Sequence, residues 1–192
     1  ASIESDLALS TSLDRLEAKV EYSQTAVGDR WLAQTLKNDD RQVLGVEDSG
    51  HLVMSAPHPK GGRCLVGDGV ASLFAVLCAM ACEEKSAPFE RGFKRRISIK
   101  DTIRSRWTGS NELADSVEHI AVLKLGEMQR GGLVGEANLM LLETEGISIG
   151  VRNSGTQAKT NVSLRLAPGI DNTVPLEAVK QIVASLQHSL ID

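Results

Sequence analysis

In the first half of the chain, short apolar runs alternate with segments whose apolar residues recur at helical spacing. The short runs predict four strands, at residues 19–22, 42–45, 52–54 and 64–66. The spacing over 28–33 predicts a helix, and Ser10-Thr11-Ser12 ahead of Leu13, Leu16 and Ala18 predicts a short capped helix. Strands that alternate with helices predict an α/β domain.

The run from Val70 to Cys82 is almost entirely apolar. It is too long for a strand and shorter than the roughly 20 residues of a membrane span, so it predicts a buried helix. Cys78 and Cys82 lie four positions apart and would share one face of that helix, where we expect them to fill the core. A metal-binding or redox-active pair of thiols is the alternative. Together with Cys64 they form no CxxC unit, which predicts a reducing, cytoplasmic setting.

The apolar pattern breaks at residues 83–88, where charged residues and a proline predict a domain boundary. We expect residues 1–86 to form a three-layer-like α/β domain with a mixed sheet and helices. We expect residues 87–192 to form an α+β domain with an antiparallel sheet.

In the second half, isoleucines alternate with polar residues inside the basic stretch 91–106, which predicts a half-exposed strand. A surface for acidic partners is the alternative. Helical spacing predicts helices over 111–128 and 176–190. Between these helices we expect two strands joined by a hairpin turn at Glu145-Gly146, and then a third strand.

Composition narrows the classes of function. The chain has 192 residues, of which 42% are apolar and 3% aromatic, with a net charge of −4. An apolar fraction of this size predicts a folded core rather than disorder. An acidic chain with few aromatic residues is not typical of a nucleic-acid-binding protein. The sequence also lacks a run long enough to cross a membrane.

The segment Arg152-Asn153-Ser154-Gly155-Thr156 is a polar loop between two apolar, strand-like runs. An arginine side chain can bind phosphate with two parallel hydrogen bonds. A glycine lets backbone N–H groups approach an anion closely, and the two hydroxyl groups add donors. The loop therefore predicts a phosphorylated ligand, and a surface salt bridge is the alternative for Arg152.

A second polar loop, residues 45–51, lies upstream. Glu47 can accept two hydrogen bonds from sugar hydroxyls, and Ser49 can donate or accept. His51 can hydrogen-bond the sugar or carry a proton near neutral pH, which makes it the candidate catalytic residue. The alternatives are a capped turn for Glu47 and Ser49 and a packed histidine for His51. Asp68 is more typical of a helix N-cap than of a catalyst.

The two loops, in this order, resemble those of the α-D-phosphohexomutase family, which includes phosphoglucomutases, phosphomannomutases and phosphoglucosamine mutases. The family's sugar loop G-E-x-S-G-H is matched by Glu47, Ser49, Gly50 and His51, and its G-D-G helix start by Gly67-Asp68-Gly69. Its phosphate loop R-x-S-G-T-E-x-K is matched by Arg152, Ser154, Gly155, Thr156 and Lys159. Its T-x-V-G-D-R segment is matched by Thr25 and residues 27–30. The matches extend from about Thr25 to Leu166.

This resemblance implies a four-domain phosphoryl-transfer enzyme built around one cleft. In that family a phosphoserine in the first domain exchanges its phosphoryl group with the sugar, through an intermediate of the glucose 1,6-bisphosphate type. Mg²⁺ held by an aspartate-rich loop of the second domain stabilises the transferring charge. The resemblance further implies that Glu47, Ser49 and His51 bind the sugar. It assigns the non-transferring phosphate of a hexose phosphate to residues 152–156 and Lys159.

The phosphoserine loop and the D-G-D-x-D-R loop do not occur in this sequence, and Asn38-Asp39-Asp40 lacks the required spacing. We therefore expect the C-terminal half of a phosphohexomutase, most of domain three plus domain four, without a metal site of its own. Its partners would be the N-terminal domains one and two, and the isolated chain would be inactive. The alternative is a non-catalytic sugar-phosphate-binding or regulatory module.

The sequence departs from the family pattern at several positions, which are Gln24, Val46, Asp48, Gln157 and Ala158. Gln24 stands where many relatives carry a basic residue, so one phosphate contact is weakened or replaced. Asp48 occupies the variable position of the sugar loop. Its identity leaves the choice among glucose, mannose and glucosamine open.

Overall fold

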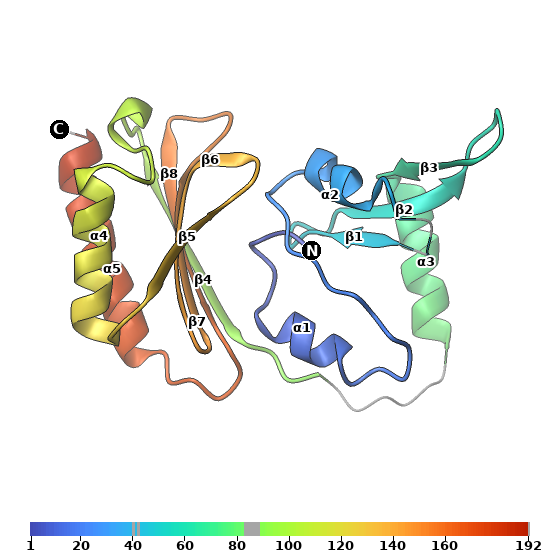
Figure 1. Ribbon diagram of the computed structural model, residues 1–192, viewed down its shortest axis with the longest axis horizontal. Coiled ribbons are helices and arrows are strands. Elements are labelled where there is room, and N and C mark those ends of the chain that lie inside the picture. Colours follow the sequence, from blue (N-terminus) through green and yellow to red (C-terminus); the bar gives the residue numbers. More distant parts are fainter. Residues whose placement is uncertain (40, 42, 83–88, 192) are drawn as a thin grey trace. The chain divides into compact units, whose positions relative to one another are not determined.

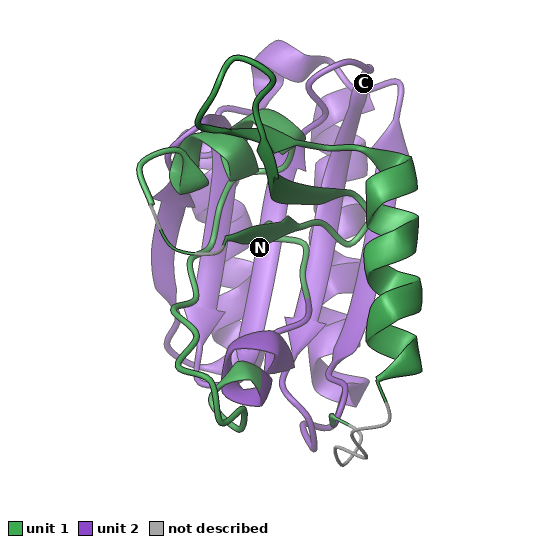
Figure 2. Ribbon diagram, turned by 90° about the vertical axis from the view of Figure 1, so that its right-hand side faces the viewer, with its two compact units in different colours: residues 1–5, 13–89 green, residues 6–12, 90–192 purple. Residues whose placement is uncertain are grey.

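A computed structural model describes residues 1–39, 41, 43–82 and 89–191 of the chain. The chain divides into two compact units (Figure 2). Unit 1 contains Ala1–Ser5 and Leu13–Phe89, and unit 2 contains Asp6–Ser12 and Glu90–Asp192. The boundary predicted between residues 86 and 87 lies outside the described residues.

Unit 1 is built on a three-stranded antiparallel sheet in the order β1-β2-β3 (Figure 1). Its elements are α2 (Asp29–Leu36), β1 (Leu44–Val46), β2 (Leu52–Pro57), β3 (Arg63–Val66) and α3 (Gly69–Ala81). β2 and β3, which contain two of the predicted strands, form an antiparallel hairpin with Ser55 opposite Leu65. The sheet was expected to be mixed, but both of its strand pairs are antiparallel. A parallel pairing occurs outside the named strands, as an isolated bridge between Ser2 and Thr25.

α2 packs closely onto β1 because β1 contributes a glycine at the contact. Leu32 of α2 is only 1% exposed. A Cβ atom placed on Gly45 would lie 2.9 Å from the Cβ of Leu32 and 3.2 Å from Cδ1 of Leu36, closer than packed side chains approach. The bare backbone of Gly45 therefore sets the distance between the helix and the strand, and with it the position of the first residues of α2.

Two elements predicted near the N-terminus are wrong. The helix in this region is α1 (Ala8–Leu13), which ends near the residue where the predicted helix was to begin, and residues 19–22 form no strand. Leu16 and Val20 are each 40% exposed. Apolar spacing produces a stable helix or strand mainly when its apolar face is covered, and here it is not.

α3 is a helix, as predicted, but the prediction that it is buried is wrong. None of its residues is buried, and Phe74 and Met80 are 62% and 78% exposed. Cys78 and Cys82 are exposed as well, so they do not fill a core. The helix is apolar on all sides, whereas a three-stranded sheet can cover only one of them.

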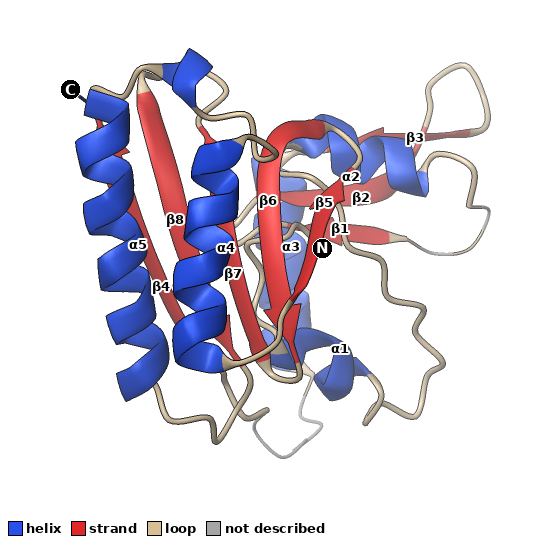
Figure 3. Ribbon diagram, turned by 60° about the vertical axis from the view of Figure 1, so that its left-hand side comes forward, coloured by secondary structure: helices blue, strands red, loops and turns tan. Residues whose placement is uncertain are grey.

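Unit 2 is a five-stranded antiparallel sheet in the order β4-β8-β7-β6-β5, with α4 and α5 on one of its faces (Figure 3). Its elements are β4 (Phe93–Lys100), the 3₁₀ helix η1 (Arg104–Arg106), α4 (Glu112–Leu125), β5 (Gln129–Leu133), β6 (Glu136–Thr144), β7 (Ile147–Asn153), β8 (Lys159–Leu166) and α5 (Thr173–Ile191). An α/β unit and an α+β unit with an antiparallel sheet together confirm the predicted fold class.

The core of unit 2 lies between the sheet and its two helices. Ile149 and Val151 of β7, and Val162 and Leu164 of β8, are fully buried there, with α4 and α5 supplying the other half of the cluster. Because side chains alternate along a strand, the intervening residues occupy the other face of the sheet. Arg152 is one of them, and it lies opposite Asn161 in the register of β7 and β8.

Most elements of unit 2 agree with the sequence pattern. The turn at Glu145-Gly146 joins β6 to β7, the basic stretch contains β4 at the edge of the sheet, and both helices lie where helical spacing placed them. β5 was not predicted, because Gly131 and Gly132 interrupt its pattern. No helix among residues 1–39, 41, 43–82 and 89–191 has the length and apolarity needed to cross a membrane.

Candidate functional site

The polar loop after β1 is a tight turn closed by its own backbone. The N–H of Glu47 donates to the carbonyl of His51 at 3.0 Å, and the N–H of Gly50 donates to the carbonyl of Glu47 at 3.0 Å. Gly50 has a φ of 92°, a conformation that glycine adopts without strain. The turn therefore brings the three predicted sugar-binding residues, Glu47, Ser49 and His51, into one short loop.

Glu47 is the most buried of these three residues, with a side chain 7% exposed. Its Oε1 accepts a short hydrogen bond from the N–H of Gly28, and its Oε2 accepts one from the hydroxyl of Ser49 at 3.2 Å. The capped turn that the sequence left as an alternative therefore exists. Each carboxylate oxygen can accept a second hydrogen bond, so Glu47 keeps capacity for a ligand.

The first residue of α2 contacts the same loop. Oδ1 of Asp29 lies 3.0 Å from Nδ1 of His51, whereas Oε2 of Glu47 lies 3.7 Å from that nitrogen, beyond hydrogen-bond distance. The side chains of His51 and Asp29 are 63% and 49% exposed. The loop and the start of α2 thus form an accessible polar surface on unit 1.

The Gly67-Asp68-Gly69 segment supports this surface and starts α3. Oδ1 of Asp68 accepts hydrogen bonds from the N–H groups of Val70 and Ala71, at 2.8 and 2.9 Å, which confirms its predicted role as a helix N-cap. A Cβ atom placed on Gly67 would lie 3.3 Å from Oδ2 of Asp29. The side chain of Asp29 therefore rests against a position that has no side chain.

The second candidate loop joins β7 to β8 in unit 2. It is closed by the N–H of Ser154, which donates to the carbonyl of Lys159 at 2.8 Å. The hydroxyl of Ser154 is part of the loop's interior, because the side chain is largely buried and Oγ accepts from the N–H of Gln157 at 3.3 Å. Gly155 and Thr156 are exposed, so their polar groups are accessible to a ligand.

Asn153 is held inside unit 2. Its Nδ2 donates to the carbonyls of Arg104 and Trp107, at 2.9 and 3.1 Å, and its Oδ1 accepts from the hydroxyl of Thr160 at 2.9 Å. The residue is 6% exposed. Both ends of the amide are therefore engaged in the protein, and the side chain anchors the base of the loop to the segment around η1.

Arg152 has an acidic neighbour on the adjacent strand. Its Nη1 lies 3.8 Å from Oε1 of Glu136 at the start of β6, and each side chain is 15% exposed. The ion pair that the sequence left as an alternative is therefore present in a partly buried form. A phosphate that binds Arg152 must compete with Glu136 for the guanidinium group.

A second cation lies beside Lys159. The register of β4 and β8 pairs Lys100 directly with Lys159. Like charges in directly opposite positions of a sheet are unfavourable unless something compensates for them. A bound phosphate would supply that compensation, so Lys100 joins Lys159 as a candidate phosphate ligand.

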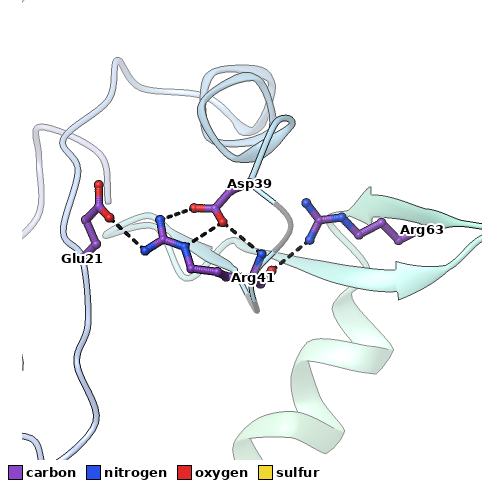
Figure 4. Close-up of polar contacts among 4 residues, drawn as sticks. All are labelled: Glu21, Asp39, Arg41 and Arg63. Carbon is purple, nitrogen blue, oxygen red and sulfur yellow. Dashed lines mark hydrogen bonds and ion pairs between the residues drawn. The ribbon is translucent and has the colours of Figure 1, made fainter.

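The acidic cluster near residue 39 forms ion pairs (Figure 4). Arg41 donates from Nε to Oδ1 of Asp39 at 2.9 Å, from Nη2 to Oδ2 at 2.6 Å, and from Nη1 to Glu21 at 2.9 Å. The hydrogen bonds from Arg41 lower the pKa of Asp39 to about 2. Both oxygens of Asp39 are engaged in this way, and Asp40 lies outside the described residues.

Asp29, Lys100 and Glu136 join these sites although the sequence did not predict a role for them. Asp29 lies 22 residues before His51, and Lys100 is far from Lys159 along the chain. The packing of α2 on β1 brings Asp29 to His51, and the register of β4 and β8 brings Lys100 to Lys159. Neither the packing nor the register can be derived from apolar periodicity alone.

Comparison with known proteins relates the chain to one family. The model of phosphoglucomutase/phosphomannomutase alpha/beta/alpha domain III matches residues 2–91, which include the loop of Glu47 and the start of α2. A phosphoglucosamine mutase of Paraburkholderia phytofirmans is 39% identical over 70 residues, 36% of this chain and 14% of the relative. One of Paraburkholderia xenovorans is 33% identical over 106 residues, 53% of this chain and 22% of the relative. The matched parts thus span well under two thirds of these relatives.

Proposed function

Because the chain belongs to the α-D-phosphohexomutase family, we propose that it recognises the substrate of an enzyme that interconverts hexose 1-phosphate and hexose 6-phosphate. In this proposal Glu47, Ser49 and His51 recognise the sugar. The observation that carries the proposal is the turn of Glu47, which lies within the matched domain III and is tied to the N–H of Gly28.

The loop of unit 2 binds the phosphate that is not transferred. Arg152 supplies a guanidinium group that can donate hydrogen bonds to two phosphate oxygens. Lys159 and Lys100 supply further positive charge. The exposed residues Gly155 and Thr156 add backbone and hydroxyl donors. Asn153 and Ser154 shape this loop, because their side chains are engaged within it.

Glucosamine phosphate is the substrate that the loop of unit 1 favours. The matched relatives are phosphoglucosamine mutases. Glu47, Asp48 and Asp29 place three carboxylates in or beside this loop, with His51 between Asp29 and Glu47. A protonated amino group on the sugar gains a charge–charge attraction from these carboxylates, whereas the neutral hydroxyl of glucose or mannose gains only hydrogen bonds.

Phosphoryl transfer itself requires the phosphoserine, the bisphosphorylated intermediate and Mg²⁺ of the family. In the described residues, Asp29, Glu47 and His51 are the one group of three metal-type side chains, with ligand atoms within 4.8 Å of one another. An imidazole between two carboxylates does not suit Mg²⁺, which prefers an all-oxygen shell. We therefore assign serine and magnesium chemistry to parts of the enzyme outside this sequence.

Calorimetric titration of the purified chain tests this function. We expect glucosamine 6-phosphate to bind more tightly than glucose 6-phosphate, N-acetylglucosamine 6-phosphate or unphosphorylated glucosamine. The Arg152→Ala variant should lose affinity for the phosphorylated ligands in particular. We expect no conversion of glucosamine 6-phosphate to the 1-phosphate by the chain alone. Robust conversion, or equal affinity for all four ligands, would contradict the proposal.

A further inference from the structure

We propose that Asp29 is the positioning residue of His51. Its carboxylate holds the imidazole in the tautomer that carries the proton on Nδ1, so that Nε2 is the nitrogen offered to the sugar phosphate. The identity of that ligand rests on the proposed function, whereas the tautomer is a property of the chain by itself.

The contact between Asp29 and His51 itself requires this tautomer. A carboxylate can only accept hydrogen bonds, so the 3.0 Å contact between Oδ1 of Asp29 and Nδ1 of His51 requires a proton on Nδ1. Glu47 does not replace Asp29 in this role, because its Oε2 is 3.7 Å from Nδ1 and already accepts a hydrogen bond from Ser49. Asp29 thus decides the tautomer of the neutral ring.

The backbone of Asp29 is itself held in place. Asp29 is the first residue of α2, and the contact between Leu32 and Gly45 sets the distance of this helix from β1. The preceding residue, Gly28, is tied by its N–H to Glu47 in the same loop as His51. The start of α2 and the loop are therefore joined at two adjacent residues, which holds the backbone of Asp29 beside His51.

Gly67 lies against the carboxylate of Asp29. A Cβ atom there would lie 3.3 Å from Oδ2 and 3.9 Å from Cγ of Asp29, so any larger residue would press on the carboxylate. Gly67 leaves room for the oxygen that does not contact His51. Three motifs of unit 1 thus meet at the carboxylate of Asp29. Asp29 belongs to the T-x-V-G-D-R segment, His51 to the sugar loop and Gly67 to the G-D-G helix start.

A fixed tautomer matters for both roles that the sequence allows for His51. With the proton on Nδ1, the neutral ring presents a lone pair on Nε2, which can accept a hydrogen bond or a proton from a sugar hydroxyl. With the proton on Nε2 instead, the same nitrogen could only donate. Asp29 therefore determines what His51 can do without having to touch the ligand.

Long-range ¹H–¹⁵N spectra of the imidazole rings in the labelled chain test this inference directly. The spectra are recorded at alkaline pH, because the two tautomers of a neutral imidazole give different patterns. We expect His51 to be protonated mainly on Nδ1. His58 is the internal control, because its Nδ1 accepts the N–H of Lys60 at 3.1 Å and should be unprotonated. A His51 ring protonated mainly on Nε2 would overturn the proposal.

Three variants separate this effect from a general loss of structure, and amide spectra check that each one folds. Asp29→Ala should move the His51 ring toward the Nε2-protonated form, whereas Glu21→Gln, which removes a carboxylate paired with Arg41, should leave it unchanged. Gly67→Ala should give a mixture of tautomers by displacing the carboxylate. An unchanged His51 ring in Asp29→Ala would refute the positioning role.

Binding of glucosamine 6-phosphate separates the inference from the proposed function. We expect Asp29→Ala to weaken binding about tenfold, the scale of one hydrogen bond of about 1.4 kcal/mol. Asp29→Asn removes the charge of the carboxylate but keeps an oxygen that can accept from Nδ1, so affinity that Asp29→Ala loses and Asp29→Asn retains reports the positioning role. Binding that is equally tight in Asp29→Ala would overturn both the positioning role and the contribution of Asp29 to the preference for an amino sugar, and would leave the roles of Glu47, Ser49 and Arg152 intact. A wild-type chain that shows the Nδ1 tautomer but does not bind would overturn the proposed function and support the Asp29 contact.

Discussion

The N–H of Gly28 donates a hydrogen bond to Oε1 of Glu47, a residue 19 positions further along the chain. This bond ties the segment that leads into α2 to the loop that follows β1. Since Asp29 is adjacent to Gly28, the same bond holds Asp29 beside His51. Glu47 therefore supports the geometry of the loop in addition to any contact that it makes with a ligand.

The Glu47→Ala substitution should destabilise unit 1 by about 1–3 kcal/mol, because it leaves the N–H of Gly28 and the hydroxyl of Ser49 without their acceptor. Urea unfolding followed by circular dichroism measures this loss. Glu47→Gln keeps an amide oxygen for Gly28 and should cost less. An alanine variant as stable as the wild type would show that the carboxylate does not support the loop.

Gly45→Ala should cost about 1–3 kcal/mol through overpacking, since the added Cβ atom would lie 2.9 Å from the Cβ of Leu32. The expected result is a lower unfolding midpoint together with shifted amide signals along α2. Gly69→Ala is the matched control, because a Cβ atom there meets no atom within 4 Å and the residue starts a helix. Equal stability of the two variants would contradict the packing described here.

Sequence pattern predicted the elements whose apolar faces are covered in the structure. α4 and α5 have such faces, which pack on the sheet of unit 2, and the two-residue turn at Glu145-Gly146 determined the pairing of β6 and β7. The apolar pattern wrongly predicted a strand at residues 19–22, and it wrongly predicted that α3 is buried. Apolar composition shows what a segment can bury, whereas the remaining elements of the unit decide whether it is buried.

Asn153→Ala should destabilise unit 2 by about 1–3 kcal/mol by removing the bonds to Arg104, Trp107 and Thr160. Asn153→Asp should also destabilise it, because a carboxylate has no N–H to donate to the two carbonyls. Thermal unfolding measures both effects, with Gln157→Ala in the exposed part of the loop as the control. A stable Asn153→Ala variant with weaker phosphate binding would instead make Asn153 a ligand-binding residue.

Glu136→Gln should strengthen the binding of inorganic phosphate several-fold, because it removes the carboxylate that lies 3.8 Å from the guanidinium of Arg152. Calorimetric titration at low ionic strength measures the change. Glu177→Gln on α5 removes the same charge far along the chain from the loop and should have little effect. If both variants bind phosphate like the wild type, Glu136 does not compete for Arg152.

The hydrogen bonds from Arg41 hold the pKa of Asp39 at about 2, below the usual value of 3.8. A lowered carboxyl pKa contributes stability above the usual pKa, and this contribution is lost as the pH falls from about 4 toward 2. The free energy of unfolding of Asp39→Asn should therefore fall less steeply over this interval than that of the wild type. Because the pair is exposed, added salt should reduce the difference. Parallel acid curves would contradict this assignment.

The candidate site could be predicted from the sequence only in part. Glu47, Ser49 and His51 belong to one short motif and Arg152 to another, so their polar character could be recognised from the sequence. Lys100 could not be recognised in the same way, because its place opposite Lys159 depends on the register of β4 and β8. The engagement of Asn153 in the interior depends likewise on the tertiary position of η1.

Amide NMR of the ¹⁵N-labelled chain, titrated with glucosamine 6-phosphate and with inorganic phosphate, tests the central claim most directly. We expect the sugar phosphate to shift signals at Glu47–His51 and at Ser154–Thr156, and inorganic phosphate to shift only those at Ser154–Thr156. The shifts at Ser154–Thr156 should vanish in Arg152→Ala. If neither loop responds to millimolar glucosamine 6-phosphate, or if the shifts persist in Arg152→Ala, these loops are not the recognition sites proposed here.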